Sequence, residues 1–287
     1  MFLRKKLQNS QLNCGIFLVS VIFSITSCQQ EVIEPFNGPY DVVLLMGQSN
    51  TLAGKGYNYY LDGIDPRVMQ LGRFGVDDHQ VIFAYEPLQN RTPLDSCIGF
   101  ALTFSKLYAA SRLGTGRKVL IIPCGANGSG FIRNGGWNRQ DSLYKDAVER
   151  TNFVLEQYPG SKLTCILWHQ GEAEYSFGPG FYQGAFERMK KSLSLDIKTE
   201  KVDSVPFILG GLVPYWINTF FFRDNVRGID SVLRNQPNRT PFTGFADPTK
   251  PFVIEKPDNK VNDIHFDANG QREMGRRYFR EYERLTK

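Results

Sequence analysis

Residues 41–46, Asp-Val-Val-Leu-Leu-Met, form a short continuous apolar run that leads directly into Gly47-Gln48-Ser49-Asn50. A run that is continuous rather than alternating is typical of a strand buried on both faces, as in a parallel sheet. Similar short runs recur further along the chain, at residues 118–123, 162–168 and 206–212. The sequence therefore predicts a parallel sheet covered on both faces.

Helical patterns alternate with these runs, over residues 99–112, 141–157, 181–195, 220–234 and 268–285. Strand alternating with helix predicts an α/β fold, a three-layer α/β/α sandwich with a mostly parallel, flavodoxin-like sheet of about five strands. We place the fifth strand at residues 252–255. Residues 54–93 are too long for an ordinary connection, so we expect a rim over the functional site with a small hairpin.

The first 28 residues have the pattern of an export signal. Arg4, Lys5 and Lys6 give a positive start, and the apolar run at residues 15–25 is shorter than the roughly 20 residues of a membrane span. The run ends in Ile25-Thr26-Ser27-Cys28, which resembles a bacterial lipobox, where the cysteine is diacylated and becomes the first mature residue.

We therefore predict a lipoprotein signal peptide at residues 1–27, a tether at residues 28–38 and one globular domain at residues 39–287. Lipid on Cys28 would anchor the protein to a membrane facing the periplasm or the cell surface. An ordinary cleaved signal peptide is the alternative, and in either case the protein is exported.

Charge and cysteine content exclude two classes of protein. The net charge is +5, but three positive charges lie in the signal, and the remaining charge of about +2 is too small for a nucleic-acid-binding surface. Outside the signal region the cysteines are Cys97, Cys124 and Cys165. An odd number argues against a disulfide framework, although one bridge is possible, and Cys165 in its apolar run is expected to be buried.

Ser49 follows a predicted strand, and open α/β sheets bind ligands at the carboxyl ends of their strands. Thr51 excludes the G-x-S-x-G elbow of α/β-hydrolases, which needs glycine there. A serine after a glycine at a strand end is more often a turn residue or helix cap than a nucleophile. The position alone therefore does not identify a catalytic serine.

Four motifs in order change that interpretation. They are Gly47-Gln48-Ser49-Asn50 with Ala53-Gly54, then Ile122-Pro123-Cys124 with Gly128-Ser129, then Trp168-His169-Gln170-Gly171-Glu172, and Asp263-Ile264-His265-Phe266 with Gly275-Arg276-Arg277-Tyr278. Together they resemble the sialate O-acetylesterase-like branch of the SGNH hydrolases, which includes acetylxylan esterases. The resemblance covers residues 41–282. It implies the SGNH hydrolase fold and a serine esterase that removes O-acetyl groups from sugars through an acetyl-serine intermediate, without a cofactor.

A serine hydroxyl needs a neighbouring base, and histidine is the usual one near neutral pH. His265 follows an acidic residue in a turn before the last helix, where it can reach a serine at a strand end. His79 lies in a polar string and is expected in a solvated loop. His169, at the end of the third strand, either lines a pocket or packs. Ser49 and His265 are therefore the predicted catalytic pair.

The resemblance also implies the donors of an oxyanion hole: the backbone N–H groups of Ser49 and Gly128, and the side-chain amide of Gln170. An ordinary tight turn is the alternative for the glycines of residues 125–130. For Gln170 and Glu172 the alternative is a buried hydrogen-bonded pair that braces the loop, and Glu172 is the predicted supporting residue of the site.

The acid of the triad departs from the family pattern. Related enzymes have Asp three residues before the catalytic His, but Asn262 stands there, and Asp263 lies two residues before His265. We predict Asp263 as the third member, because a carboxylate stabilises the imidazolium formed in catalysis. Asn262, which would orient the ring without charge, is the alternative.

Metal chemistry is not predicted, since His169 and Glu172 lack the further ligands of a zinc site and no H-E-x-x-H motif exists. The expected partner is an O-acetylated carbohydrate such as sialic acid or an acetylated polysaccharide, with no nucleic acid. Two other functions remain open: a general short-chain esterase or lipase, and a non-catalytic glycan-binding lipoprotein of the surface.

Overall fold

The computed structural model describes residue 36 and residues 38–199, 201–255 and 264–287 of the 287-residue chain. Its centre is a seven-stranded sheet in the order β4-β3-β6-β1-β7-β8-β9, in which every neighbouring pair is parallel except β3 and β4. The strands are β1 (Tyr40–Gly47), β3 (Val68–Leu71), β4 (Val81–Phe83), β6 (Lys118–Gly125), β7 (Lys162–His169), β8 (Phe207–Gly210) and β9 (Thr243–Ala246). A small antiparallel pair, β2 (Gly54–Lys55) and β5 (Cys97–Ile98), lies apart from it.

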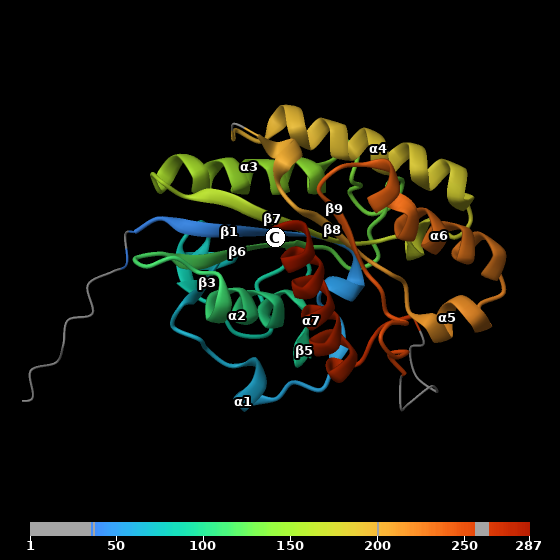
Figure 1. The fold of residues 1–287 in the computed structure, drawn as a ribbon, viewed down its shortest axis with the longest axis horizontal. Helices are drawn as coiled ribbons and strands as arrows, with labels where there is room; N and C mark the ends of the chain where they lie inside the picture. Colours follow the sequence, from blue (N-terminus) through green and yellow to red (C-terminus); the bar gives the residue numbers. More distant parts are fainter. Residues whose placement is uncertain (1–35, 37, 200, 256–263) are drawn as a thin grey trace, which may run out of the picture. The chain divides into compact units, whose positions relative to one another are not determined.

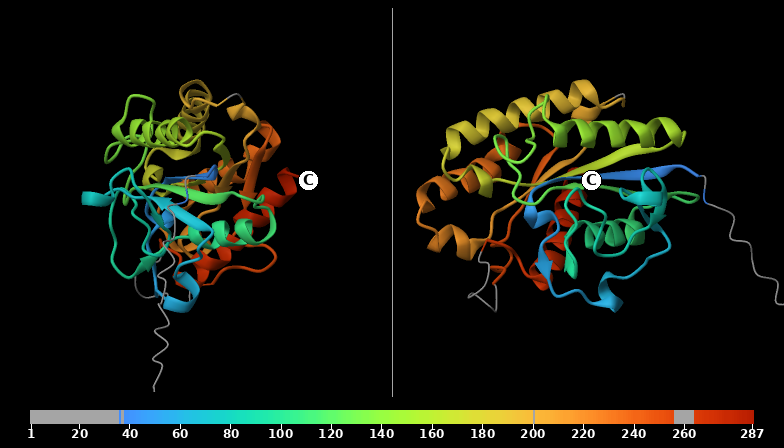
Figure 2. Two further views of the ribbon diagram at one scale, coloured as in Figure 1. Left: turned by 90° about the vertical axis from the view of Figure 1, so that its left-hand side faces the viewer. Right: turned by 180° about the vertical axis from the view of Figure 1, so that it is seen from behind.

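Helices cover both faces of the sheet (Figure 1), and the end-on view in Figure 2 separates the three layers. One face carries α3 (Ser142–Gln157), α4 (Gly178–Asp196) and α6 (Arg223–Arg239), and the other carries α2 (Ala101–Ser111) and α7 (Ala268–Leu285). Two short helices, α1 (Tyr59–Asp62) and α5 (Pro214–Thr219), lie outside these layers. Single 3₁₀ turns occur at Ser49–Thr51, Gly75–Asp77, Glu172–Glu174 and Val202–Ser204. The predicted α/β/α sandwich is confirmed.

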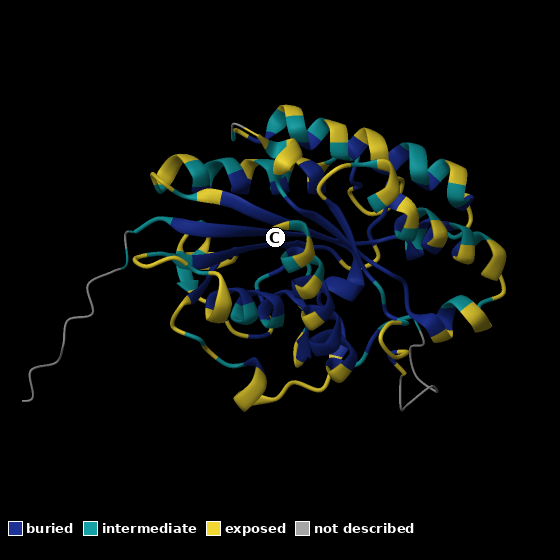
Figure 3. Cartoon of the chain, viewed as in Figure 1, coloured by how far each residue is buried: buried dark blue, intermediate teal, exposed yellow. Residues whose placement is uncertain are grey.

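The continuous apolar runs become the central strands because both faces of the sheet are covered. Every residue of β1 is buried, as are all residues of β7 except Lys162, and Figure 3 shows the strands almost entirely dark blue. Burying a side chain such as Leu44 stabilises the fold by roughly 1.5–3 kcal/mol. Cys97, Cys124 and Cys165 are free thiols in this core, and burial raises the pKa of Cys165 far above its usual value.

Three strands end at the same level. In the sheet register Gly47 of β1 lies beside Gly125 of β6 on one side and His169 of β7 on the other. The chain reaches β6 on one side of β1 and then crosses to β7 on the other side. This reversal of strand order is where open α/β sheets form their ligand sites, outside the carboxyl ends of the strands. The fold therefore places residue 48 and its successors at that point.

The sheet has seven strands where about five were predicted, and the strand placed at residues 252–255 was wrong. Residues 252–255 form no strand, and the last strand of the described sheet is β9, in a segment rich in turn residues. Phe252 is instead 56% exposed, with the Arg277 guanidinium over its ring. Gly244 allows β9 to lie close to α7, because a Cβ there would come within 3.1 Å of Glu281. A run of apolar residues at 252–255 therefore did not identify the sheet strand.

The segment at residues 54–93 contributes more than a rim. Its hairpin exists, formed by β3 and β4, but β3 also joins the main sheet in parallel with β6. The helix expected at residues 220–234 runs instead from Arg223 to Arg239, whereas α7 has the predicted limits. No helix within the described ranges is both long and apolar enough to cross a membrane.

Candidate active site

Ser49 lies immediately beyond the sharp turn that ends β1. Gly47 has φ +133°, and a Cβ at that position would lie 2.1 Å from the carbonyl oxygen of His169. The Gln48 N–H donates to the same oxygen at 2.9 Å. Only glycine permits this close approach of the two backbones. The turn brings Ser49, 3% exposed, to the carboxyl edge of the sheet.

His265 meets Ser49 across 216 residues of sequence, with its Nε2 2.7 Å from the Ser49 Oγ. The histidine lies just before α7, which Asp267 caps by accepting a hydrogen bond from the Gly270 N–H at 2.7 Å. Side-chain capping of this kind fixes the entry of the chain into a helix. A hydroxyl within hydrogen-bonding distance of an imidazole is the arrangement that generates a serine nucleophile.

Asn50 holds the backbone on either side of His265. Its Nδ2 donates to the Ile264 carbonyl at 2.9 Å, and its Oδ1 accepts from the Phe266 N–H at 3.1 Å. Its own carbonyl accepts from the Gln271 side chain at 3.0 Å, which ties it to α7. Sequence reasoning missed this positioning role, although Asn50 belongs to the same four-residue motif as Ser49.

Asn50 also connects the pair to a buried carboxyl group. Its Nδ2 donates to Glu172 Oε1 at 2.5 Å, and Glu172 is 1% exposed. Burial raises the pKa of Glu172 to about 7, against the hydrogen bond from Asn50, which lowers it. The predicted supporting residue Glu172 thus contacts the neighbour of the serine.

Gln170 is fully buried and braces the loop after β7. Its amide nitrogen donates to Gln48 Oε1 at 3.2 Å and to Glu174, and Glu174 also accepts from the Phe131 N–H at 2.6 Å. The bracing partner of Gln170 is therefore Glu174, not Glu172 as the sequence suggested. Because both acceptors already use its N–H groups, the role of Gln170 in an oxyanion hole stays a prediction.

The other two predicted oxyanion donors have their hydrogens available. Within the described residues, neither the Ser49 N–H nor the Gly128 N–H donates a hydrogen bond. Gly128 has φ +65° in a loop held against β1, because the Ala126 N–H donates to the Gly47 carbonyl at 3.0 Å. This left-handed backbone conformation favours glycine at residue 128.

The two remaining histidines do not contact Ser49 in the part of the chain that the structure describes. His79 is in a loop, with its Nδ1 3.1 Å from Asp78 and its ring edge-on to Phe153. His169 is fully buried and contacts the Tyr278 hydroxyl at 3.2 Å. Burial lowers the pKa of His169 to about 3, so it is neutral in the folded protein. Of the two alternatives for His169, packing holds.

Three predicted site residues, Cys28, Asn262 and Asp263, lie outside the described residues. Among the residues that the structure does describe, no group of three or more His, Cys, Asp or Glu side chains is arranged to hold a metal ion.

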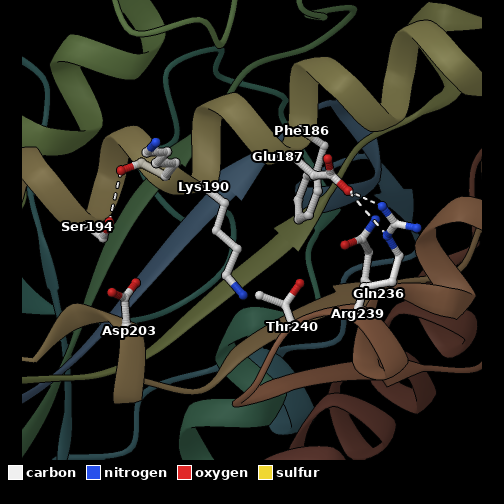
Figure 4. Close-up of a pocket in the computed structure, with 9 residues that line it drawn as sticks. Phe186, Glu187, Lys190, Ser194, Asp203, Gln236, Arg239 and Thr240 are labelled. Carbon is white, nitrogen blue, oxygen red and sulfur yellow. Dashed lines mark hydrogen bonds and ion pairs between the residues drawn. The ribbon is translucent and has the colours of Figure 1, made fainter.

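A separate pocket of about 630 Å³ lies between α4 and α6 (Figure 4). One of its lining residues, Lys190, donates to the hydroxyl of Thr243 at 2.6 Å and lies 5.4 Å from the ring of Phe207. Thr243 and Phe207 are the first residues of β9 and β8. The pocket therefore belongs to the amino edge of the sheet, opposite Ser49.

Comparison with known families identifies the family of this chain. Residues 39–284 match the family described as carbohydrate esterase, sialic acid-specific acetylesterase. The chain belongs to this family. Membership of this family makes the chain a carboxylic ester hydrolase that acts on acetylated carbohydrates. A sequence comparison with curated proteins gives no match.

Solved structures share the fold at low sequence identity. NanS aligns with a TM-score of 0.72 at 19% identity, over 86% of this chain and 98% of NanS. A protein from Arabidopsis thaliana aligns with a TM-score of 0.62 at 17% identity, over 86% and 98% of the two chains. A carbohydrate acetylesterase from Xanthomonas citri aligns with a TM-score of 0.57 at 17% identity, over 85% of this chain and 56% of that one.

The buried Glu172 predicts a pH dependence of stability. Its pKa in the folded protein, about 7, lies above the usual 4.5, so its contribution is full below pH 4.5 and is lost as the pH rises through 7. Glu172→Gln removes this titration. The stability of the variant relative to the unmodified protein should therefore rise by on the order of 3 kcal/mol between pH 4.5 and pH 8.

Urea unfolding at the two pH values measures this difference, with the exposed Glu149→Gln as the matched control. A difference that is the same at both pH values would show that burial does not raise the pKa of Glu172 above its usual value.

Proposed function

We propose that Ser49 is the nucleophile and His265 the general base of a carbohydrate O-acetylesterase. The observation that carries the proposal is the 2.7 Å contact between Ser49 Oγ and His265 Nε2 at the carboxyl edge of the sheet. Support comes from the backbone on both sides of His265, which Asn50 holds, because a base must be kept in a fixed orientation to accept a proton efficiently.

The reaction proceeds in two halves. Ser49 Oγ attacks the acetyl carbonyl carbon as its proton passes to His265 Nε2, and the tetrahedral intermediate expels the sugar oxygen, which takes that proton. Water then gives a proton to His265 and attacks the acetyl-serine, and acetate leaves as the proton returns to Ser49. The N–H groups of Ser49 and Gly128 stabilise the oxyanion; each such donor typically contributes about 10²–10³ in turnover. Gln170, which donates to Gln48 and Glu174, would join them by giving up one of these two hydrogen bonds.

The third member of the triad is Asp263 in this proposal, with Asn262 as the alternative. Asp263 stands two residues before His265. A carboxylate at that place would hold the imidazole tautomer and stabilise the positive charge that forms during acyl transfer. Glu172 supports the site through Asn50.

The acyl group in the proposal is acetyl, and the alcohol is a hydroxyl of sialic acid or of a polysaccharide. The segment at residues 54–93 favours sugars over long acyl chains, since it exposes tyrosines such as Tyr59 and Tyr60 instead of a continuous aliphatic groove. A general short-chain esterase or lipase is the competing enzyme, and a glycan-binding lipoprotein without activity is the competing binding protein.

We also propose that the protein is exported and anchored by lipid on Cys28. The support is the apolar run that closes on Ile25-Thr26-Ser27-Cys28 after a positively charged start. An acylated anchor would hold the esterase domain near a membrane that faces its carbohydrate substrates.

Ser49→Ala and His265→Ala should each lower esterase turnover by roughly 10³-fold or more, and the double variant should be no slower than either single variant, because members of one catalytic unit are not additive. Aryl acetate hydrolysis and circular dichroism measure activity and folding. His79→Ala, a histidine far from the serine, serves as the control. If Ser49→Ala keeps most of its turnover, the site lies elsewhere.

Acetyl esters should be hydrolysed with a higher kcat/KM than octanoyl esters of the same aryl alcohol. Acetate release from O-acetylated sialic acid and from acetylated xylan then tests the two sugar classes. Faster octanoyl cleavage would replace the carbohydrate esterase with a lipase-like enzyme, whereas failure on both glycans would exclude only those two sugars.

Cys28→Ala should release the protein from membranes or block its processing, since the acylated thiol is the proposed attachment point. Membrane fractionation and mass spectrometry of the mature N-terminus measure both effects. A mature N-terminus at another residue, without acylation, contradicts the anchor.

A further inference from the structure

Four exposed tyrosines lie together on the segment of residues 54–93. Tyr57, Tyr59, Tyr60 and Tyr85, with Gly63 and Ile64, line a cleft of about 500 Å³, here called the tyrosine cleft. Tyr59 is 72% exposed and Tyr60 is 91% exposed, and their rings meet edge to face at 5.7 Å. Soluble proteins rarely expose apolar surface in such a group unless it binds something.

Hydrogen bonds and an ion pair hold this exposed group in place. Asn58 caps α1 by accepting from the N–H groups of Tyr60 and Leu61, and its own N–H donates to Asp62 Oδ2 at 2.8 Å. Asp62, 2% exposed, forms a two-point ion pair with Arg272 at 2.9 and 2.5 Å. The Asp62 carbonyl also accepts from the Glu86 N–H at 3.0 Å, which fixes the residue next to Tyr85. These contacts therefore hold the backbone beneath the tyrosine rings in one position.

The same backbone contacts connect the tyrosine cleft to the proposed catalytic pair. Arg272 donates to the Gly56 carbonyl at 3.1 Å, directly before Tyr57, and a Cβ on Gly56 would lie 3.2 Å from Ala268. Both contacts are with the first turns of α7, which begins three residues after His265. From this part of α7 Gln271 reaches the Asn50 carbonyl. In Figures 1 and 2 the chain between α1 and β2 runs beside the N-terminal end of α7.

We propose that the tyrosine cleft binds a neutral pyranose ring of an oligosaccharide whose acetylated residue lies at Ser49. Tyrosine offers a flat apolar face to the C–H face of a sugar and a hydroxyl for its polar rim. The residues that line the cleft carry no carboxylate, ammonium or guanidinium group, which favours a neutral sugar over an acidic one. The inference rests on the proposed carbohydrate esterase function and extends it to a second sugar site.

The test compares a polymeric with a minimal substrate. Tyr59→Ala and Tyr60→Ala should each raise KM for O-acetylated neutral oligosaccharides about tenfold, since an aromatic contact contributes on the order of that factor. Hydrolysis of an aryl acetate, which carries no second sugar ring, should not change. Tyr60→Phe should restore most of the affinity because it keeps the ring. Leu195→Ala, 66% exposed at the end of α4, is the matched control.

Binding separates this inference from the proposed reaction. Calorimetry of Ser49→Ala with unacetylated oligosaccharides of xylose, glucose or galactose should show binding that Tyr59→Ala and Tyr60→Ala weaken. If the unmodified enzyme releases no acetate from any glycan, the proposed function fails while this binding still tests the cleft. Unchanged KM and unchanged binding in the alanine variants overturn the inference.

Two other possible occupants of the tyrosine cleft would each give a distinct experimental result. A dimer in sedimentation that Tyr60→Ala dissociates would assign the tyrosine cleft to a second copy of the chain. Binding of the domain of residues 39–287 to phosphatidylcholine and phosphatidylglycerol vesicles, lost in Tyr60→Ala, would assign it to a membrane. Either result overturns the sugar site. A protein that sediments as a monomer and does not bind vesicles supports it.

Discussion

The contact between the backbone of Gly47 and that of His169 is the constraint on which the site depends. A side chain at residue 47 would overlap the His169 carbonyl, and the Gln48 N–H donates to that same carbonyl. The Gly47 carbonyl in turn accepts from Ala126 and so holds the loop that contains Gly128. The ends of β1, β6 and β7 are thereby held together, and Ser49 has one position relative to the two loops that contain Gly128 and Gln170.

Buried polar side chains around this contact position the proposed catalytic pair, Ser49 and His265. Asn50 and Glu172 hold the His265 loop on one side, and Gln170 with Glu174 braces the loop after β7. Burying carboxyl groups costs free energy unless they are hydrogen-bonded or neutral, and the raised pKa values of Glu172 and Glu174 record that cost. Burial of these carboxyl groups lowers the stability of the fold, but their hydrogen bonds keep Ser49 and His265 in one geometry.

Helix α7 joins His265, the proposed general base, to the outer surface of the molecule. It begins just after His265 and contacts Asn50 through Gln271. Through Arg272 it binds Asp62, which holds the backbone beneath the tyrosine cleft. One rigid helix therefore relates the reacting atoms to a surface of exposed rings. A carbohydrate esterase needs both, since acetyl chemistry alone does not distinguish one glycan from another.

The sequence by itself determined the α/β/α layers, helix α7 and the motifs of Ser49 and His265, because continuous apolar runs and helical periodicity are local signals. Only the tertiary structure decided that Thr243–Ala246 and not residues 252–255 enters the sheet, that Gln170 pairs with Glu174, and that Asn50 positions His265. Each of these depends on partners distant in sequence or on which side of a turn a side chain emerges. A short strand that packs closely through a glycine leaves no periodic pattern in the sequence. The same holds for polar side chains whose partners lie 122 or 216 residues away, since these contacts form only when the chain has folded.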